Sequence, residues 1–231
     1  EQDLAHLARL MGNDATLAQA GLVATKENVV FMISNGTAAP GLRAANNYFV
    51  AGIATISPQS TTASVTSTLV LDATKQPGFI GTPIVELNGT NAGTENGFAI
   101  YGASNSVVRG FIINRFNKHG IGLSLGSSNC VIAGNYIGTN AAGTAASPND
   151  MHGVSIESDA ENNIIGGTTA ADRNLLSGNG ASGVAVAHIG ATGNMIMGNY
   201  LGTNAAGTGA VPNTFTGVYL FSSTSNTTPS A

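Results

Sequence analysis

The stretch GNYIGTNAAGTAASPN occupies residues 134–149, and 64 positions later (198 − 134) residues 198–213 read GNYLGTNAAGTGAVPN. Neither copy contains a charged residue, and both are rich in Gly, Asn and Thr. Internal repetition is the signature of solenoid proteins, in which each repeat is one unit that stacks on the next. The two copies therefore predict equivalent coils within one repetitive domain.

A shorter pattern, glycine followed by alternating apolar residues, recurs at separations of 23, 33, 30 and 34 residues. Each of its first four copies is followed by a second apolar segment that begins at an asparagine. Segments of three to five residues with many β-branched side chains are too short for helices and predict strands. The five copies are GFAI at 97–100, GIGL at 120–123, GVSI at 153–156, GVAV at 183–186 and GVYL at 217–220.

Such short strands bury their apolar side chains only by stacking on equivalent strands of the next repeat, ~4.8 Å away. The predicted fold class is therefore all-β: a single-stranded parallel β-helix, right-handed because parallel crossovers almost always are. We expect the β-helix to span residues 25–231, with a C-terminal coil that begins at 217–220 and is incomplete.

Residues 1–24 differ in kind, because apolar side chains recur there with helical spacing. We expect a short amphipathic helix that caps the open first coil and covers its unpaired backbone groups. A loosely docked N-terminal tail is the alternative. The residues on the predicted apolar face are Leu4, Leu7, Leu10 and Met11.

The composition excludes several classes of protein. Charged residues make up 9% of the 231, against roughly 25% in ordinary soluble domains. No apolar run approaches the ~20 residues of a transmembrane helix, and 42% hydrophobic residues is too many for a disordered chain. The net charge is −4 without a basic stripe, which argues against nucleic-acid binding. The single cysteine, Cys130, excludes an internal disulfide framework.

Four segments together resemble bacterial right-handed β-helix repeat proteins of the pectate-lyase-like superfamily. They are TPIVELNGTNAG from Thr82, NGFAIYGASNSVVRGFIINRF from Asn96, GNYIGTN from Gly134 and NNIIGGTTAADRNLLSGN from Asn162. The resemblance implies the β-helix architecture and an extracellular or cell-surface location. That superfamily includes lyases, hydrolases, adhesins and inert stalks, so the resemblance is specific for architecture and not for activity.

His119 and His152 each precede the glycine of the repeated pattern in consecutive coils. Equivalent positions of neighbouring coils lie ~4.8 Å apart, so we expect the two imidazoles side by side. Such a pair is able to act as catalytic acid and base or to bind a soft metal. The alternative is a polar ladder along a turn, because the column reads Asn96, His119, His152, Ser182, Thr216.

Two further sets of residues are candidates for ligand binding. Tyr136 and Tyr200 hold equal positions in the two copies of the sixteen-residue stretch and form a candidate sugar-stacking surface. Arg109, Arg115 and Lys118 lie within one coil and form a candidate patch for a polyanion.

Asparagines and acids supply the remaining candidates. Asparagines in one turn column are predicted to form a structural ladder, with amides bonded up and down the stack: Asn105, Asn129, Asn162 or Asn163, and Asn194. The densest acidic cluster is a candidate Ca²⁺ cage or, alternatively, a solvated turn: Asp150, Glu157, Asp159 and Glu161. No other cofactor is expected.

These patterns predict an extracellular structural or adhesive module, such as a stalk, a filament or a surface-array segment. Its expected partners are copies of itself joined head to tail, neighbouring β-helix coils, or glycans. The alternative is a carbohydrate-active enzyme, either a polysaccharide lyase or a glycoside hydrolase. Apart from the histidine pair, the sequence offers that enzyme no catalytic residues.

Overall fold

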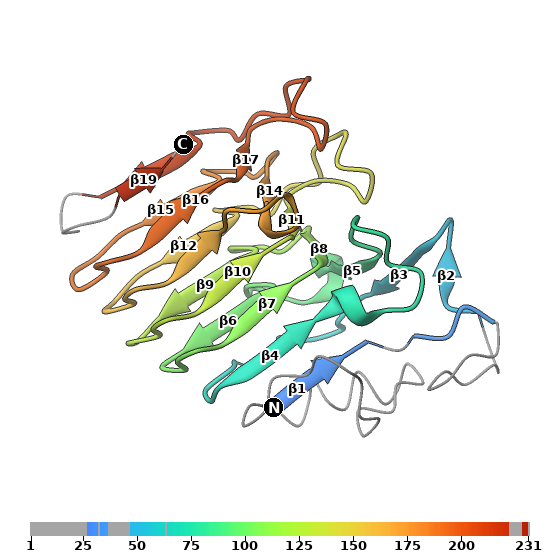
Figure 1. Ribbon diagram of the computed structural model, residues 1–231, viewed down its shortest axis with the longest axis horizontal. Coiled ribbons are helices and arrows are strands. Elements are labelled where there is room, and N and C mark those ends of the chain that lie inside the picture. Colours follow the sequence, from blue (N-terminus) through green and yellow to red (C-terminus); the bar gives the residue numbers. More distant parts are fainter. Residues whose placement is uncertain (1–26, 32, 37–46, 63, 222–227, 231) are drawn as a thin grey trace.

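Short apolar strands, separated by turns of Gly and Asn, pair in parallel with the equivalent strands of the next coil (Figure 1). The computed structural model describes residues 27–31, 33–36, 47–62, 64–221 and 228–230. The chain visits three sheets in turn, so that strands distant in sequence lie side by side in each. The arrangement is that of a parallel β-helix, as the sequence predicts.

The first sheet has the order β1-β4-β7-β10-β13-β16-β19, and its strands follow one another along the molecule (Figure 1). Their bounds are Glu27–Val30, Leu69–Asp72, Val107–Arg109, Val131–Ala133, Ile164–Gly166, Met195–Met197 and Thr228–Ser230.

The second sheet has the order β17-β14-β11-β8-β5-β3-β2. Its first six strands pair in parallel, whereas β2 pairs with β3 antiparallel, which departs from the predicted regular coil. Their bounds are Tyr200–Leu201, Leu175–Leu176, Tyr136–Ile137, Phe111–Asn114, Val85–Asn88, Ile53–Ile56 and Phe49–Val50.

The third sheet, with the order β18-β15-β12-β9-β6, contains the repeated glycine pattern. Its strands are Val218–Leu220, Val184–Val186, Val154–Ile156, Ile121–Ser124 and Phe98–Tyr101. Among the described residues the only helices are single 3-10 turns: Ala73–Lys75, Gly89–Asn91 and Ala170–Asp172. The predicted capping helix of residues 1–24 lies outside the described residues.

Alternate strand residues point inward and form aliphatic columns along the interior. Val108, Ile132 and Ile165 follow one another in register, and each is at most 1% exposed. Because every coil places the same kind of side chain at the same point, apolar surface is buried between coils as well as between sheets. Equivalent columns run through Phe98, Ile121, Val154 and Val184, and through Leu87, Ile113, Ile137 and Leu176.

Buried asparagines close the corners between the sheets. At the corner before β13, Asn163 Oδ1 accepts a bond from the backbone N–H of Cys130 (2.9 Å), and its Nδ2 donates to the carbonyl of Ser127 (3.1 Å). Asn194 repeats the arrangement one coil later and accepts from the N–H of Asn163 (3.0 Å). Each amide thus satisfies backbone groups that the turn leaves without a strand partner.

The structure divides the predicted ladder between two adjacent columns. Asn163 and Asn194 belong to the buried column, whereas Asn105 and Asn129 occupy the position one residue earlier in the repeat and are exposed. Their φ values are 57° and 54°, and the column continues through Asn162 at 55°. Asparagine tolerates this left-handed backbone better than most residues, so two columns use the same residue type for different reasons.

Two further asparagine ladders, which were not predicted from the sequence, occupy the other corners. In both, a side-chain Oδ1 accepts the backbone N–H of the preceding coil at distances of 2.9 to 3.2 Å. The Nδ2 atom of each amide donates a hydrogen bond to a carbonyl oxygen of that preceding coil. The two sets are Asn135, Asn174 and Asn199, and Asn149, Asn179 and Asn213.

The repeated sixteen residues encode a closed loop. In the first copy Asn140 Oδ1 accepts from the N–H of Thr144 (2.9 Å), and Asn204 makes the same bond to Thr208 (3.0 Å) in the second. The two loops also touch, since the N–H of Ala205 donates to the carbonyl of Gly143 (2.8 Å).

Candidate functional site

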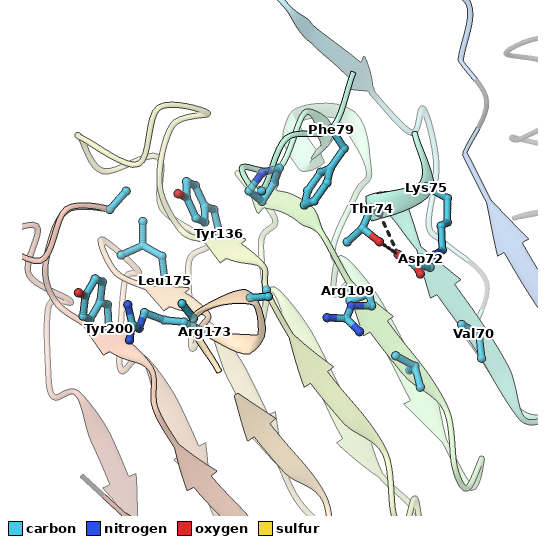
Figure 2. A pocket seen from close by; sticks show the side chains of 17 residues that line it. Val70, Asp72, Thr74, Lys75, Phe79, Arg109, Tyr136, Arg173, Leu175 and Tyr200 are labelled. Carbon is cyan, nitrogen blue, oxygen red and sulfur yellow. Dashed lines mark hydrogen bonds between the residues drawn. The ribbon is translucent and has the colours of Figure 1, made fainter. Parts of the chain in front are cut away.

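A groove of about 530 Å³ runs along the corner between the first and second sheets. Arg109 ends β7 and Asp72 ends β4, and these two residues are in register. Figure 2 shows Arg109 between the Asp72–Lys75 turn and Arg173, with Phe79 and Tyr136 along the other wall.

Strand register also brings the two repeated tyrosines into this groove. Tyr136 begins β11 and Tyr200 begins β17, and both pair with Leu175 of the strand between them. Their side chains point outward because Ile137 and Leu201, the next residues, point into the core. The two tyrosines therefore occupy equivalent positions in their coils, as the repeat predicts.

The tyrosine rings are only partly available to a ligand. A Cβ added at Gly143 would lie 3.0 Å from Tyr136 Cε2, and one added at Gly207 would lie 2.9 Å from Tyr200 Cζ. The repeated loops therefore fold onto the rings, and both glycines are needed for that approach. Burial raises the pKa of Tyr136, an effect that a hydrogen bond with Thr82 opposes, so this phenol is neutral at physiological pH.

Cations outnumber carboxylates in the groove. Arg109 forms a 3.3 Å ion pair with Asp172, and its Nε is buried without a hydrogen-bond partner. The guanidinium of Arg173 lies 4.4 Å from the ring centroid of Tyr200, a cation–π contact. Lys75 and Asp72 also line the groove, so its lining has three cations and one anion, and Asp172 pairs with Arg109 from outside the lining.

The structure separates the other two predicted cations from this groove. Arg115 pairs with Glu86 (3.2 Å), and Lys118 lies 3.8 Å from Glu95. The predicted set of Arg109, Arg115 and Lys118 is therefore not one patch. Lys75, Phe79 and Arg173, which also line the groove, were not predicted from the sequence, because none of them belongs to a repeated pattern.

A second hollow, of about 340 Å³, lies over the third sheet and includes His119. The rings of His119 and His152 stack with centroids 5.2 Å apart and planes 7° from parallel, as the register predicts. Burial, reinforced by the neighbouring His152, lowers the pKa of His119 to about 4. Burial also lowers the pKa of His152.

Hydrogen bonding decides what the histidine pair is able to do. His119 Nδ1 accepts the backbone N–H of His152 (3.2 Å), and His152 Nδ1 accepts that of Ser182 (3.1 Å). A neutral imidazole that accepts at Nδ1 has its proton on Nε2, so Nε2 has no lone pair for a metal or for a substrate proton. The geometry therefore favours the ladder over the acid–base or metal-binding hypothesis.

The predicted acidic cluster is dispersed over its coil. Glu157 lies 3.8 Å from His119 Nε2 and 3.9 Å from His188 Nε2, whereas Asp159 and Glu161 are exposed. Among the described residues no group of three or more His, Cys, Asp or Glu side chains has the spacing of a metal site. The described part of the chain likewise has no helix with the length and apolar character needed to cross a membrane.

Comparison with protein-family models, with curated proteins and with solved structures found no significant match to this chain.

Proposed function

We propose that the chain is a structural and adhesive module of the extracellular space or the cell surface. In this proposal it is a right-handed β-helix of the pectate-lyase-like kind that presents a glycan-binding groove on a rigid body. The groove carries the proposal, because it combines aromatic rings, guanidinium groups and a length that spans several coils.

The chemistry of the lining supports a saccharide ligand. The partly exposed side chains of Tyr136, Tyr200 and Phe79 offer apolar contact to sugar C–H groups. Arg109 and Arg173 present N–H donors to hydroxyl or carboxylate oxygens. A groove that mixes apolar walls with a few placed polar groups is the usual form of a small-molecule or glycan site.

The body of the molecule supports a structural role. From β4 to β18 every coil bonds to the next through three sheets, and amide ladders close the corners, so bending a coil away would break many hydrogen bonds together. Only 9% of the residues are charged, so the polar side chains of the molecule are mainly uncharged amides and hydroxyls. Such a surface suits association with copies of the chain, which a sedimentation series over increasing concentration tests; a monomer throughout would contradict it.

Titration of neutral and acidic polysaccharides into the purified protein tests the groove. Arg173→Ala removes the cation over Tyr200 and should weaken binding about tenfold. Arg115→Ala is the matched control, because Arg115 is an exposed, ion-paired arginine outside the groove, and it should leave the affinity unchanged. Equal losses in both variants, or no binding by the unaltered protein, would refute a glycan site here.

A carbohydrate-active enzyme is the second candidate, and the two carboxylates beside Arg109 favour it. Asp72 and Asp172 flank Arg109, as paired acids flank the scissile bond in glycoside hydrolases. Each already accepts a hydrogen bond from a threonine hydroxyl, which leaves less of its capacity for a substrate. Release of reducing ends or unsaturated sugars, lost in Asp72→Asn, would establish the enzyme; binding without product supports the adhesive module.

A further inference from the structure

The histidine pair occupies a column whose other members are amide and hydroxyl side chains. Asn96, His119, His152 and Ser182 each stand before a glycine at the entrance to a strand of the third sheet. The N–H of His119 donates to Asn96 Oδ1 (3.1 Å), the first step of a ladder that continues through the two imidazoles.

Histidine is able to fill the same role as asparagine in this column for a geometric reason. Oδ1 of asparagine and Nδ1 of histidine are both one bond beyond Cγ, so either atom reaches the N–H of the coil above. The bonds at His119 Nδ1 and His152 Nδ1 measure 3.2 and 3.1 Å, close to the 3.1 Å bond at Asn96. The stacked imidazole rings thus take the same place between coils in this column as the stacked amides take at the corners.

This substitution makes the ladder depend on protonation. An amide oxygen accepts at any physiological pH, whereas a protonated imidazole has N–H groups on both nitrogens and accepts at neither. Protonation of His119 would place its Nδ1–H against the N–H of His152. Protonation of His152 would do the same to the N–H of Ser182.

Groups around the pair act on this protonation in opposite directions. Glu157, held by a bond from Ser155 (2.5 Å), faces His119 and His188 and favours the charged imidazole. Burial, the second ring and Lys118, itself paired with Glu95, disfavour it. The neighbours Asn96 and Tyr101 are neutral, and the ring of Tyr219 stacks 6.4 Å from that of His152.

We infer that His119 and His152 form an acid-sensitive latch between the coils of the third sheet. When neutral, the imidazoles bind the next coil; when protonated, they release the backbone N–H groups of His152 and Ser182 and loosen the edge of β12 and β15. The latch is separate from the groove and does not depend on the proposed glycan binding.

The direction of the pH effect follows from linkage. The pKa of His119 is about 4 in the folded protein and 6.5 in the unfolded chain, so the unfolded chain binds more protons between these values. The stabilisation is therefore complete above pH 6.5 and is lost as the pH falls toward 4. From pH 7 to pH 4.5 His119 alone should shift the folding equilibrium toward the unfolded chain on the order of 50-fold.

Urea unfolding of the full chain between pH 7 and pH 4.5 tests the latch. The double variant His119→Asn, His152→Asn keeps the acceptors and removes the titration, so its acid loss should be smaller than that of the unaltered protein by roughly that 50-fold. His188→Asn is the control, because exposed His188 also faces Glu157 but no backbone N–H donates to it in the described contacts; it should keep the full loss. Equal acid losses in all three proteins would overturn the inference.

Imidazole ¹⁵N spectra of the unaltered protein give a second reading that needs no variant. At pH 7 the Nδ1 atoms of His119 and His152 should be unprotonated and Nε2 protonated. Spectra in which Nδ1 has the proton would overturn the inference, even if the double variant failed to fold.

Discussion

At the scale of single residues, glycine has two separate uses in this chain. Gly143 has a φ of 64°, which other residues adopt at a cost. Gly120, Gly153 and Gly183 have ordinary backbones, but an added Cβ at each would lie 2.7 Å from the carbonyl oxygen of the next glycine in the column. Glycine is therefore required before each of these strands because adjacent coils lie too close together for a Cβ atom.

Alanine at this column tests that reading. Gly153→Ala should destabilise the protein by about 1–3 kcal/mol, because the methyl group overpacks a contact between backbones. Gly217→Ala is the matched control in the same column, since its nearest contact among the described residues would be an ordinary 3.5 Å and its φ is not positive. It should change the stability by less than about 0.5 kcal/mol. Equal losses in denaturant unfolding would contradict the collision as the cause, because reduced entropy of the unfolded chain alone would make both alanine variants more stable.

The asparagine ladders were predicted only in part from the sequence. The sequence predicted an amide ladder, and Asn163 and Asn194 form one. Asn105 and Asn129 belong to the neighbouring left-handed column, because residue type alone does not distinguish a buried hydrogen-bonding amide from a tolerated φ. The ladder through Asn135, Asn174 and Asn199 was missed because its spacings of 39 and 25 residues include insertions of different length.

At the scale of elements, strands were predicted well because burial on one face fixes their register. Alternating apolar residues gave the strands near 97–100, 120–123, 153–156, 183–186 and 217–220, and each pairs with the next. The groove was predicted only in part. Tyr136, Tyr200 and Arg109 stood out by repetition or charge, whereas Lys75 and Phe79 come from an irregular turn whose path depends on tertiary packing.

A charge placed in an interior column tests the strand register. Ile132 of β10 is fully buried between Val108 and Ile165. Ile132→Asp should abolish cooperative unfolding, because an unpaired carboxylate in this column costs more than a domain of this size can offset. Val131→Asp is the control, since Val131 is the adjacent residue and is only partly buried. Thermal melting that stayed cooperative in Ile132→Asp would contradict the inward assignment.

At the scale of the whole molecule, the coil is the structural unit. Contacts run from each coil to its neighbours through the same three sheets, so stability is close to a sum over coils and their interfaces. The sequence predicted this organisation because the repeated patterns have periods of 23 to 34 residues.

Removal of one whole coil should therefore be tolerated. Deleting residues 153–182 removes β12, β13 and β14 and brings β15, β16 and β17 into their places. We expect a folded β-protein whose denaturant m-value is lower by about an eighth, in proportion to the chain removed. Deleting residues 153–167 removes strands from only two sheets and should give an aggregated chain. Circular dichroism and urea unfolding distinguish the outcomes, and two equally disordered products would mean that the coil is not the unit.

The bond between Ala205 and Gly143 joins turns of the spiral that are not neighbours. A β-helix in which each coil bonds only to the adjacent coils is able to unfold one coil at a time under tension. Here the hydrogen bond links the coil of β11 directly to the coil of β17, and the coil of β14 lies between them. A molecule pulled from its ends should yield in this stretch as one block, visible in a force–extension trace as a single long step.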